Sequence, residues 1–184
     1  MSTYSTQNSL LLTNLMRFYR KDNNIDKMLS IINGESKISL RLVDWFATNY
    51  SKKYYTVYTL SDKRRFKVYV DYKLKLRAYS KKRFDPFCRW DRIVVPYKGD
   101  KSIQTTLGQL NFFKWALENE LIAYIEQNYS TIEKDMNNRN STAKRKVTPT
   151  ATSTQKTRKK REELSLSATK SIYKEDVEIV VKFD

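Results

Sequence analysis

The sequence predicts an α+β fold, and three observations indicate it. Apolar residues recur with helical spacing in the first 50 residues and again between residues 106 and 129. Between these regions, residues 64–79 alternate apolar and polar side chains, which is the period of a strand. The chain has only 3 Gly and 3 Pro among 184 residues, which argues against a repeat or loop-built architecture. We therefore expect N-terminal helices, an antiparallel β-meander with a long hairpin, and a C-terminal core helix packed on the sheet.

The N-terminal region is expected to form three short amphipathic helices. The first covers residues 5–21 and the second roughly residues 24–33, after which Gly34 suits the left-handed residue that ends many helices. The third begins near Ser39, a plausible N-cap, and continues to about residue 50. Trp45 lies off the apolar stripe of this third helix. We expect its side chain to line an interface.

The predicted hairpin joins a strand at residues 53–60 to the alternating segment at residues 64–79. Sixteen residues exceed the usual strand length, so we expect a bend or bulge near Asp71. A helix from Tyr72 onward is the alternative, and it fits the alternation less well. The hairpin places the apolar side chains of the long strand on one face and its cations on the other.

A turn at residues 84–87 separates the hairpin from a third strand at residues 89–95. Asp85 precedes Pro86, and Asp side chains in such turns accept hydrogen bonds from the backbone downstream. Thr106 and Gln109 then have the spacing of a capping box, which predicts a core helix from there to about Tyr129. A short last helix follows to about residue 138.

Positive charge is the main functional signal in the sequence. The formal net charge is +16, and residues 52–98 alone hold 15 Lys and Arg against 4 Asp. A balance of this kind favours polyanionic partners: nucleic acid, an anionic membrane or an acidic protein. The polar face of the predicted long strand carries cations with Tyr between them, and a basic loop follows it. The candidate nucleic-acid-binding residues here are Arg65, Lys67, Tyr69, Lys73, Lys75, Arg77, Tyr79, Lys81, Lys82 and Arg83.

Cations of this surface would attract phosphates, and its aromatic rings would stack on unpaired bases. Two other interpretations stay open. The face could be a solvated surface whose Lys residues discourage edge-to-edge pairing of strands. It could also bind an acidic protein or lipid.

A change of composition divides the chain near residue 140. We expect one α+β domain at residues 1–139, a basic disordered arm at 140–162 and a docking segment at 163–184. The arm consists largely of Ser, Thr, Lys and Arg, which bury too little apolar surface to fold. Its two basic clusters resemble a bipartite nuclear-import signal, and they would equally bind phosphates without sequence preference. These candidate residues are Lys144, Arg145, Lys146, Lys156, Arg158, Lys159, Lys160 and Arg161.

The end of the chain again alternates apolar and polar residues. This pattern predicts a terminal strand that pairs with an edge of its own sheet or of a partner's sheet. The partner-docking candidates are Val177, Ile179, Val181 and Phe183.

The residue types argue against an enzyme. The chain has no His and a single Cys, so a His-based triad or a His/Cys zinc site has no ligands or base. Cys88 lies in an aromatic turn where a packed structural thiol is the simpler interpretation. We expect no catalytic residues, no metal and no cofactor. The lone Cys also suits a reducing compartment, and no apolar run is long enough to span a membrane.

Four stretches resemble an uncharacterised family of giant nucleocytoplasmic large DNA viruses of the mimivirus and phycodnavirus kind. They are RLVDWFATNYSKK (41–53), AYSKKRFDPFCR (78–89), QTTLGQLNFFKWALEN (104–119) and ELSLSATKSI (163–172). The resemblance implies a viral product in the virion or in the host cytoplasm and viral factory, with the nucleus open through the basic clusters. The leading hypothesis is a non-enzymatic, weakly sequence-selective nucleic-acid-binding protein. The alternative is a virion structural or scaffold protein that contacts other viral proteins through its C-terminal segment.

Overall fold

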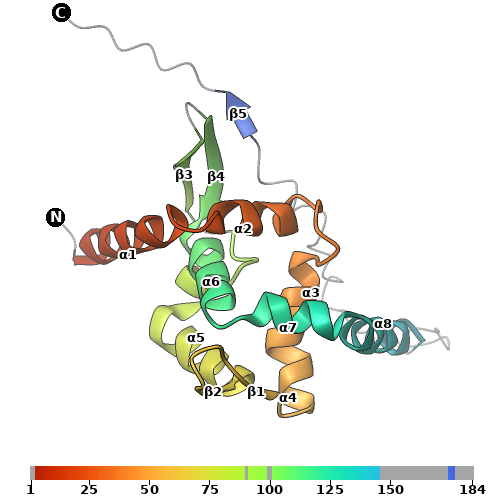
Figure 1. Ribbon diagram of the computed structural model, residues 1–184. Helices are drawn as coiled ribbons and strands as arrows, with labels where there is room; N and C mark the ends of the chain where they lie inside the picture. The colour runs from red at the N-terminus through yellow and green to blue at the C-terminus, as the bar shows by residue number, and fades with distance from the viewer. Residues whose placement is uncertain (1–2, 90, 99–100, 146–173, 177–184) are drawn as a thin grey trace, which may run out of the picture.

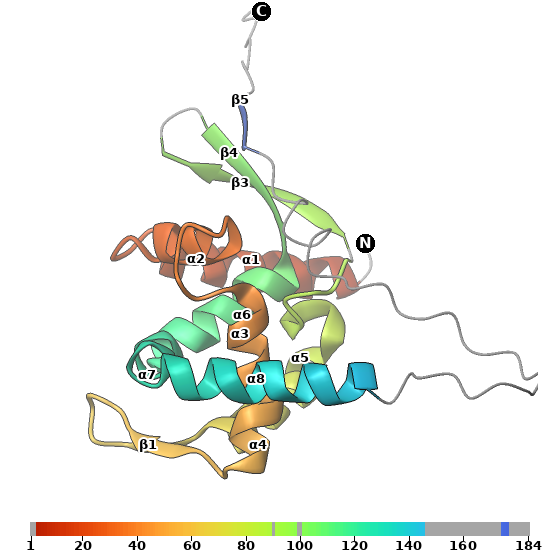
Figure 2. The same ribbon diagram turned by 90° about the vertical axis from the view of Figure 1, so that its right-hand side faces the viewer.

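A computed structural model describes residues 3–89, 91–98, 101–145 and 174–176 (Figures 1 and 2). The elements in chain order are α1 (Thr3–Tyr19), α2 (Asn24–Ile32), α3 (Leu40–Trp45), a π-helix (Phe46–Tyr50), α4 (Ser51–Lys53), β1 (Val57–Thr59), β2 (Arg65–Lys67), α5 (Val68–Phe84), β3 (Arg92–Tyr97), β4 (Lys101–Thr106), α6 (Leu107–Glu118), α7 (Leu121–Gln127), α8 (Tyr129–Arg145) and β5 (Lys174–Asp176).

The predicted α+β class is confirmed, with helices dominating two small antiparallel sheets. One sheet is the β1–β2 hairpin, in which Tyr58 pairs with Phe66. The other has the order β3–β4–β5, in which Val95 pairs with Ile103. Figure 1 shows α1, α2 and the β3–β4 hairpin at one end of the molecule and α4 with the β1–β2 hairpin at the other. Helix α6 lies between these two ends.

Helix α6 is the centre of the core, as its apolar content indicated. The Thr106 hydroxyl accepts a hydrogen bond from the Gln109 backbone N–H at 3.1 Å, which satisfies one of the free N–H groups at the helix start. The side chains of Phe112 and Phe113 are fully buried. Helix α6 packs chiefly against α5 and α1, while β4 leads directly into it.

Two hydrogen bonds from aromatic side chains fix the neighbours of α6. The Tyr19 hydroxyl on α1 donates to the Leu110 carbonyl at 2.6 Å. The Trp115 indole N–H donates to the Asp71 carboxylate on α5, also at 2.6 Å. Each bond pairs a polar atom that burial would otherwise leave unsatisfied, so both orient the helices as well as stabilise them.

The prediction of a strand over residues 64–79 is wrong beyond Lys67. Strand β2 ends there, and α5 continues from Val68 to Phe84. A kink interrupts this helix at Ser80, whose φ of 64° and ψ of 167° are not helical. The expected long hairpin is therefore a short one, and a helix carries most of the basic residues.

The alternation misled because it contains a helical stripe. Val68, Tyr72 and Leu76 belong to the alternating apolar set, yet they are also four residues apart, and Tyr79 follows three residues later. Val68 and Tyr72 are buried, and Leu76 and Tyr79 pack against the core. The remaining alternating apolar residues of α5 are exposed: Val70 with an exposed fraction of 54%, Leu74 with 60%, and Ala78. Packing against α6 therefore favoured the helical period, although the alternation of the sequence fits a strand better.

Several other boundaries differ from the prediction. The core helix ends at Glu118, and α7 starts after Glu120, which has a left-handed φ of 56°. The third helix does begin after the Ser39 cap, but it changes to a π-helix at Phe46. The last helix, α8, continues to Arg145 instead of ending near residue 138.

Gly108 is required by the close approach of α5 and α6. A Cβ atom at this position would lie 2.6 Å from the Asp85 carbonyl oxygen and 3.3 Å from that of Lys82. Both oxygens belong to the backbone at the end of α5, so neither can move aside cheaply. The predicted turn follows at once, with the Asp85 carboxylate accepting from the Phe87 N–H at 2.9 Å.

Within the described ranges, no helix has both the length and the apolar character needed to cross a bilayer.

Candidate nucleic-acid interface

The predicted ladder of cations does not share one strand face. Arg65 and Lys67 lie on β2, where both side chains are exposed on either side of buried Phe66. Lys73 and Arg77 lie four residues apart on the solvent side of α5 and are also exposed. Lys75 is half-buried nearer the core. A change from strand to helix has therefore divided the set and left four of its five cations exposed.

These exposed cations, together with Lys52 on α4, form what we call the basic end of the molecule. Its members are Lys52, Arg65, Lys67, Lys73 and Arg77. None of them makes an ion pair with a described residue. Asp71 is the acid on α5, and its carboxylate accepts the Trp115 indole N–H. The basic end therefore keeps its positive charge within the part of the chain that the structure describes.

The two predicted tyrosines of the ladder are not free to stack on a ligand in the expected way. The Tyr79 ring lies stacked with the Phe84 ring at 6.1 Å, facing the core. Tyr69 is half-buried, and the Lys52 ammonium lies 5.7 Å from its ring centroid. This last contact joins α4 to α5.

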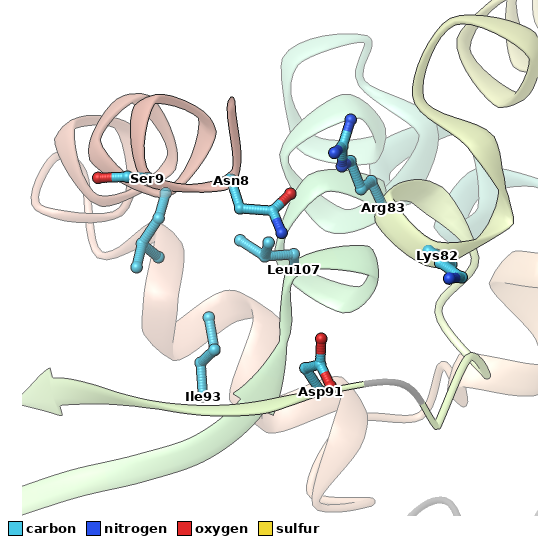
Figure 3. A pocket seen from close by; sticks show the side chains of 8 residues that line it. Asn8, Ser9, Lys82, Arg83, Asp91, Ile93 and Leu107 are labelled. Atoms are coloured by element: carbon cyan, nitrogen blue, oxygen red, sulfur yellow. The ribbon is translucent and has the colours of Figure 1, made fainter. Parts of the chain in front are cut away.

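The predicted basic loop at residues 81–83 is the last turn of α5. Lys81 is exposed, whereas Lys82 and Arg83 line a pocket at the junction of α1, α5, β3 and α6 (Figure 3). The Arg83 guanidinium donates a hydrogen bond to the Gln7 side chain at 3.4 Å. The backbone carbonyl of Arg83 accepts one from the Asn111 side-chain amide at 2.9 Å. Arg83 is thus held between helices and is separated from the outward cations of the basic end.

A polar groove between α4 and α8 adds residues that the sequence reasoning did not place at the interface. Lys53 and Tyr54 form one wall, and residues of the first turns of α8 form the other. The lining residues of this α4–α8 groove are Lys53, Tyr54, Ser130, Thr131, Lys134, Asp135, Asn138 and Arg139. Helix α4 therefore contributes Lys53 to the α4–α8 groove and Lys52 to the contact with Tyr69 of α5.

Asp135 organises the α4–α8 groove by accepting three hydrogen bonds. The donors are the Lys53 ammonium at 2.6 Å, the Tyr54 hydroxyl at 3.1 Å and the Trp45 indole at 3.2 Å. Burial alone would raise the pKa of Asp135, but these hydrogen bonds outweigh it and hold that pKa below its usual value. The hydrogen bond between Lys53 and Asp135 in turn raises the pKa of Lys53. Both groups are charged at neutral pH, so the pair is an ion pair.

Trp45 packs inside the chain, where α3 meets α8, so its predicted place at an interface with a partner stays a prediction. Its indole bonds Asp135 of α8, and the Arg139 guanidinium lies 5.7 Å from its ring. Arg139 also donates to the Asn49 side chain in the π-helix at 3.4 Å. A π-helix is uncommon and often occurs at functional sites. Here it belongs to the helical segment, from Leu40 to Lys53, that faces α8.

Tyr55, which follows α4, is the most exposed large hydrophobic side chain of the described region, at 86%. Tyr54 beside it is 50% exposed. Both escaped the sequence analysis because residues 53–60 read as one strand, in which neither side chain stands out. A signal was present in the Lys-Lys-Tyr-Tyr run, which puts two cations next to two aromatics.

The basic arm and the docking segment fall mostly outside the described residues. The backbone of Lys144 and Arg145 forms the end of α8. The other predicted residues of these segments lie outside the described ranges: Lys146, Lys156, Arg158, Lys159, Lys160, Arg161, Val177, Ile179, Val181 and Phe183. Of the terminal region, β5 is described, and its Glu175 pairs with Ser102 of β4.

Cys88 is a free, half-buried thiol, and its backbone N–H donates to the Asp85 carbonyl at 3.1 Å. Within the described ranges, no three Cys, Asp or Glu side chains gather in a way that would hold a metal ion.

Comparison of the sequence with known protein families identifies the family of this chain. The profile of one family, described as a family of unknown function (DUF7197), matches residues 3–184. The chain belongs to this family. An uncharacterized protein of Acanthamoeba polyphaga mimivirus is 47% identical over 117 residues, which cover 59% of this chain and 45% of the relative. The chain thus aligns with less than half of that relative's length. No solved structure matches the chain. The expected relationship to a giant-virus family is confirmed.

Proposed function

We propose that the protein binds nucleic acid without catalysis and with weak sequence selectivity, through the basic end and the Lys/Arg-rich arm at residues 144–161. The observation that carries this proposal is the set of five exposed cations at the basic end that have no acidic partner among the described residues. A folded protein that keeps such a set uncompensated bears a repulsive cost, which a polyanion removes.

The arrangement of the cations suits a phosphate backbone. Lys73 and Arg77 are one turn apart on α5, about 6 Å along the helix axis, so both can contact one strand. Lys52 and Lys67 extend the charge across α4 and β2. Phosphate contacts of this kind carry no sequence information, and the base edges would be read weakly. We propose the virion or the viral factory as the place of action, with the import-like clusters offering a route to the nucleus.

A binding role is favoured over an enzymatic one by the residue types. The chain has no imidazole for acid–base chemistry, so none can activate Cys88, which lies between Phe87 and Arg89 in the sequence. In the α4–α8 groove, Asp135 is tied into a network, since its carboxylate accepts hydrogen bonds from Lys53 and from two aromatic side chains.

The test is a charge reversal at the basic end. Lys73→Glu/Arg77→Glu should weaken binding of mixed-sequence oligonucleotides and lower the slope of log affinity against log salt by about 1.5, since each lost phosphate contact contributes about 0.7 to 0.9. Lys21→Glu/Lys27→Glu is the matched control, because it removes the same charge from exposed positions at the α1–α2 end. Equal weakening in both variants would show that only net charge matters, and unchanged binding in the first would remove α5 from the interface.

A second candidate function is supported by β5. Lys174–Asp176 pairs antiparallel with β4, so the C-terminal segment can add a strand to an open edge of the β3–β4 hairpin. The same edge would accept the strand of a neighbouring subunit, as an assembly or scaffold protein requires. Deletion of residues 163–184 should then abolish self-association, measured by light scattering, while oligonucleotide binding persists. Self-association that survives this deletion would contradict the scaffold role.

A further inference from the structure

Tyr55 has no internal role, in contrast to many of the tyrosines whose side chains the structure describes. The hydroxyls of Tyr19, Tyr58 and Tyr97 donate to Leu110, Asn119 and Asp26, respectively, each at 2.6 Å. Tyr55 makes no hydrogen bond and no ring contact with a described residue, and 86% of its surface is exposed. A large aromatic side chain in water adds nothing to the stability of the fold.

The backbone at Tyr55 is also one that a tyrosine does not favour. The Thr56 N–H donates to the Ser51 carbonyl at 3.1 Å, which closes a Schellman motif at the end of α4. In this motif the residue in the position of Tyr55 takes the left-handed conformation, and its φ is indeed 49°. Glycine usually occupies such a position, because a Cβ atom is strained there. The chain therefore bears a local cost to keep a Tyr where Gly would fit better.

The surroundings of Tyr55 are cationic. Lys52 and Lys53 precede Tyr55 in α4. Val57, two residues after Tyr55, pairs with Lys67 across the β1–β2 hairpin. Tyr54 cannot take the same role, because its ring lies 4.5 Å from that of Tyr50 and beneath the Lys53 ammonium at 4.6 Å. Tyr55 is thus the most exposed aromatic ring among the described residues near the basic end, whereas Tyr69 is half-buried beside Lys52.

We propose that Tyr55 is a stacking anchor for an unpaired base, and that the ligand class of the basic end is single-stranded nucleic acid. The inference rests on the proposed function and makes it more specific. A flat aromatic face next to cations is the arrangement by which proteins hold single strands, with the base on the ring and the phosphates on Lys and Arg. Stacking is tolerant of base identity, which agrees with weak sequence selectivity. A duplex offers no unpaired base to such a ring.

The experiment compares stability and binding in Tyr55→Gly. The substitution relieves the left-handed backbone, so its Tm should rise by about 2 to 4 °C. Loss of one stacked base should weaken binding of a single-stranded oligonucleotide about five-fold to a hundred-fold, whereas binding of a duplex of the same sequence should change less than two-fold. Two controls accompany it. Tyr55→Phe keeps the ring and should bind like the wild type. Asn23→Gly changes another left-handed position, between α1 and α2, without removing an aromatic.

The outcomes separate the two proposals. Lower single-strand affinity in a variant of equal or higher Tm supports the inference, because a folding defect would lower both. Unchanged single-strand affinity in Tyr55→Gly overturns the stacking role and leaves the proposed function intact. This outcome includes the case in which Tyr55 anchors a protein partner instead. Equal weakening of single-strand and duplex binding also overturns it. If the wild-type chain binds neither ligand at low salt, the proposed function fails and the stacking inference fails with it.

Discussion

Helices α5 and α6 pack against each other but present opposite kinds of surface. Helix α6 buries most of its length, including Phe112 and Phe113, and its Gln109 and Asn111 side chains form hydrogen bonds inside the protein. Helix α5 buries only Val68, Tyr72 and Phe84. Its outward side carries exposed Val70 and Leu74 between cations. The difference indicates that the fold depends on α6 and on the inner side of α5, while the outer side of α5 is available for a partner.

Substitution of a buried aromatic on α6 should have the largest effect on stability. The Phe112 side chain is fully buried, and its ring lies 5.9 Å from those of Phe84 and Phe113 and 5.7 Å from that of Trp115. Phe112→Ala should lower the free energy of unfolding by about 3 to 5 kcal/mol, because it removes apolar contacts and leaves a cavity. Urea denaturation of the variant and the wild type measures this loss of unfolding free energy. A loss below about 1 kcal/mol would show that α6 is not the centre of the core.

A partly buried acid beside α5 should make stability depend on pH. Burial, with a smaller contribution from Asp85, raises the pKa of Asp44 from 3.8 to about 7. The native state then holds a proton between about pH 4 and pH 7 that the unfolded state has released. Stability therefore falls through this window as pH rises, and the full cost is present above pH 7.

Asp44→Asn removes this cost. Because one pKa unit corresponds to 1.36 kcal/mol, the shift sets an upper limit of about 4 kcal/mol, and partial exposure of the side chain lowers it. We expect the variant to be about 1 to 3 kcal/mol more stable at pH 8 and unchanged at pH 4, as measured by urea denaturation at both pH values. Equal stability of the two proteins at pH 8 would contradict the raised pKa.

The smallest effect is expected on the outer side of α5. Leu74 is 60% exposed, so Leu74→Gln should change the free energy of unfolding by less than about 0.5 kcal/mol. Leu110 on α6 is fully buried and supplies the matched comparison, since Leu110→Ala should cost about 2 to 5 kcal/mol. Thermal or urea unfolding of the two variants side by side gives the contrast. Similar losses in both would mean that the outer side of α5 also belongs to the core.

Local signals in the sequence predicted the helix starts well. Ser39 and Thr106 both cap helices as expected, with bonds from the Leu42 and Gln109 N–H groups, and Gly34 takes a left-handed φ of 75°. Such signals depend on neighbouring residues only, so the sequence is sufficient for them. The left-handed residue Glu120, which breaks the predicted core helix, has no such signal because Gly is absent there.

The basic surface was predicted in composition but not in geometry. Exposed cations were expected between Arg65 and Arg77, and most of them are exposed, yet their placement depended on whether residues 68–79 form a strand or a helix. Contacts with α6, distant in sequence, decide that question. Tyr55 was missed for a different reason, since its exposure follows from the local end of α4, which has no Gly to signal it, and not from any periodic pattern.

The most direct test of nucleic-acid binding by the folded basic end is hydrogen–deuterium exchange of the full chain with and without a single-stranded oligonucleotide. Binding slows exchange where the ligand protects the backbone or the elements it contacts. We predict slower exchange in residues 50–79, which include α4, the β1–β2 hairpin and the first part of α5, and unchanged exchange in α2. Protection confined to the arm at residues 144–161, or to α1 and α2, would contradict binding by the basic end.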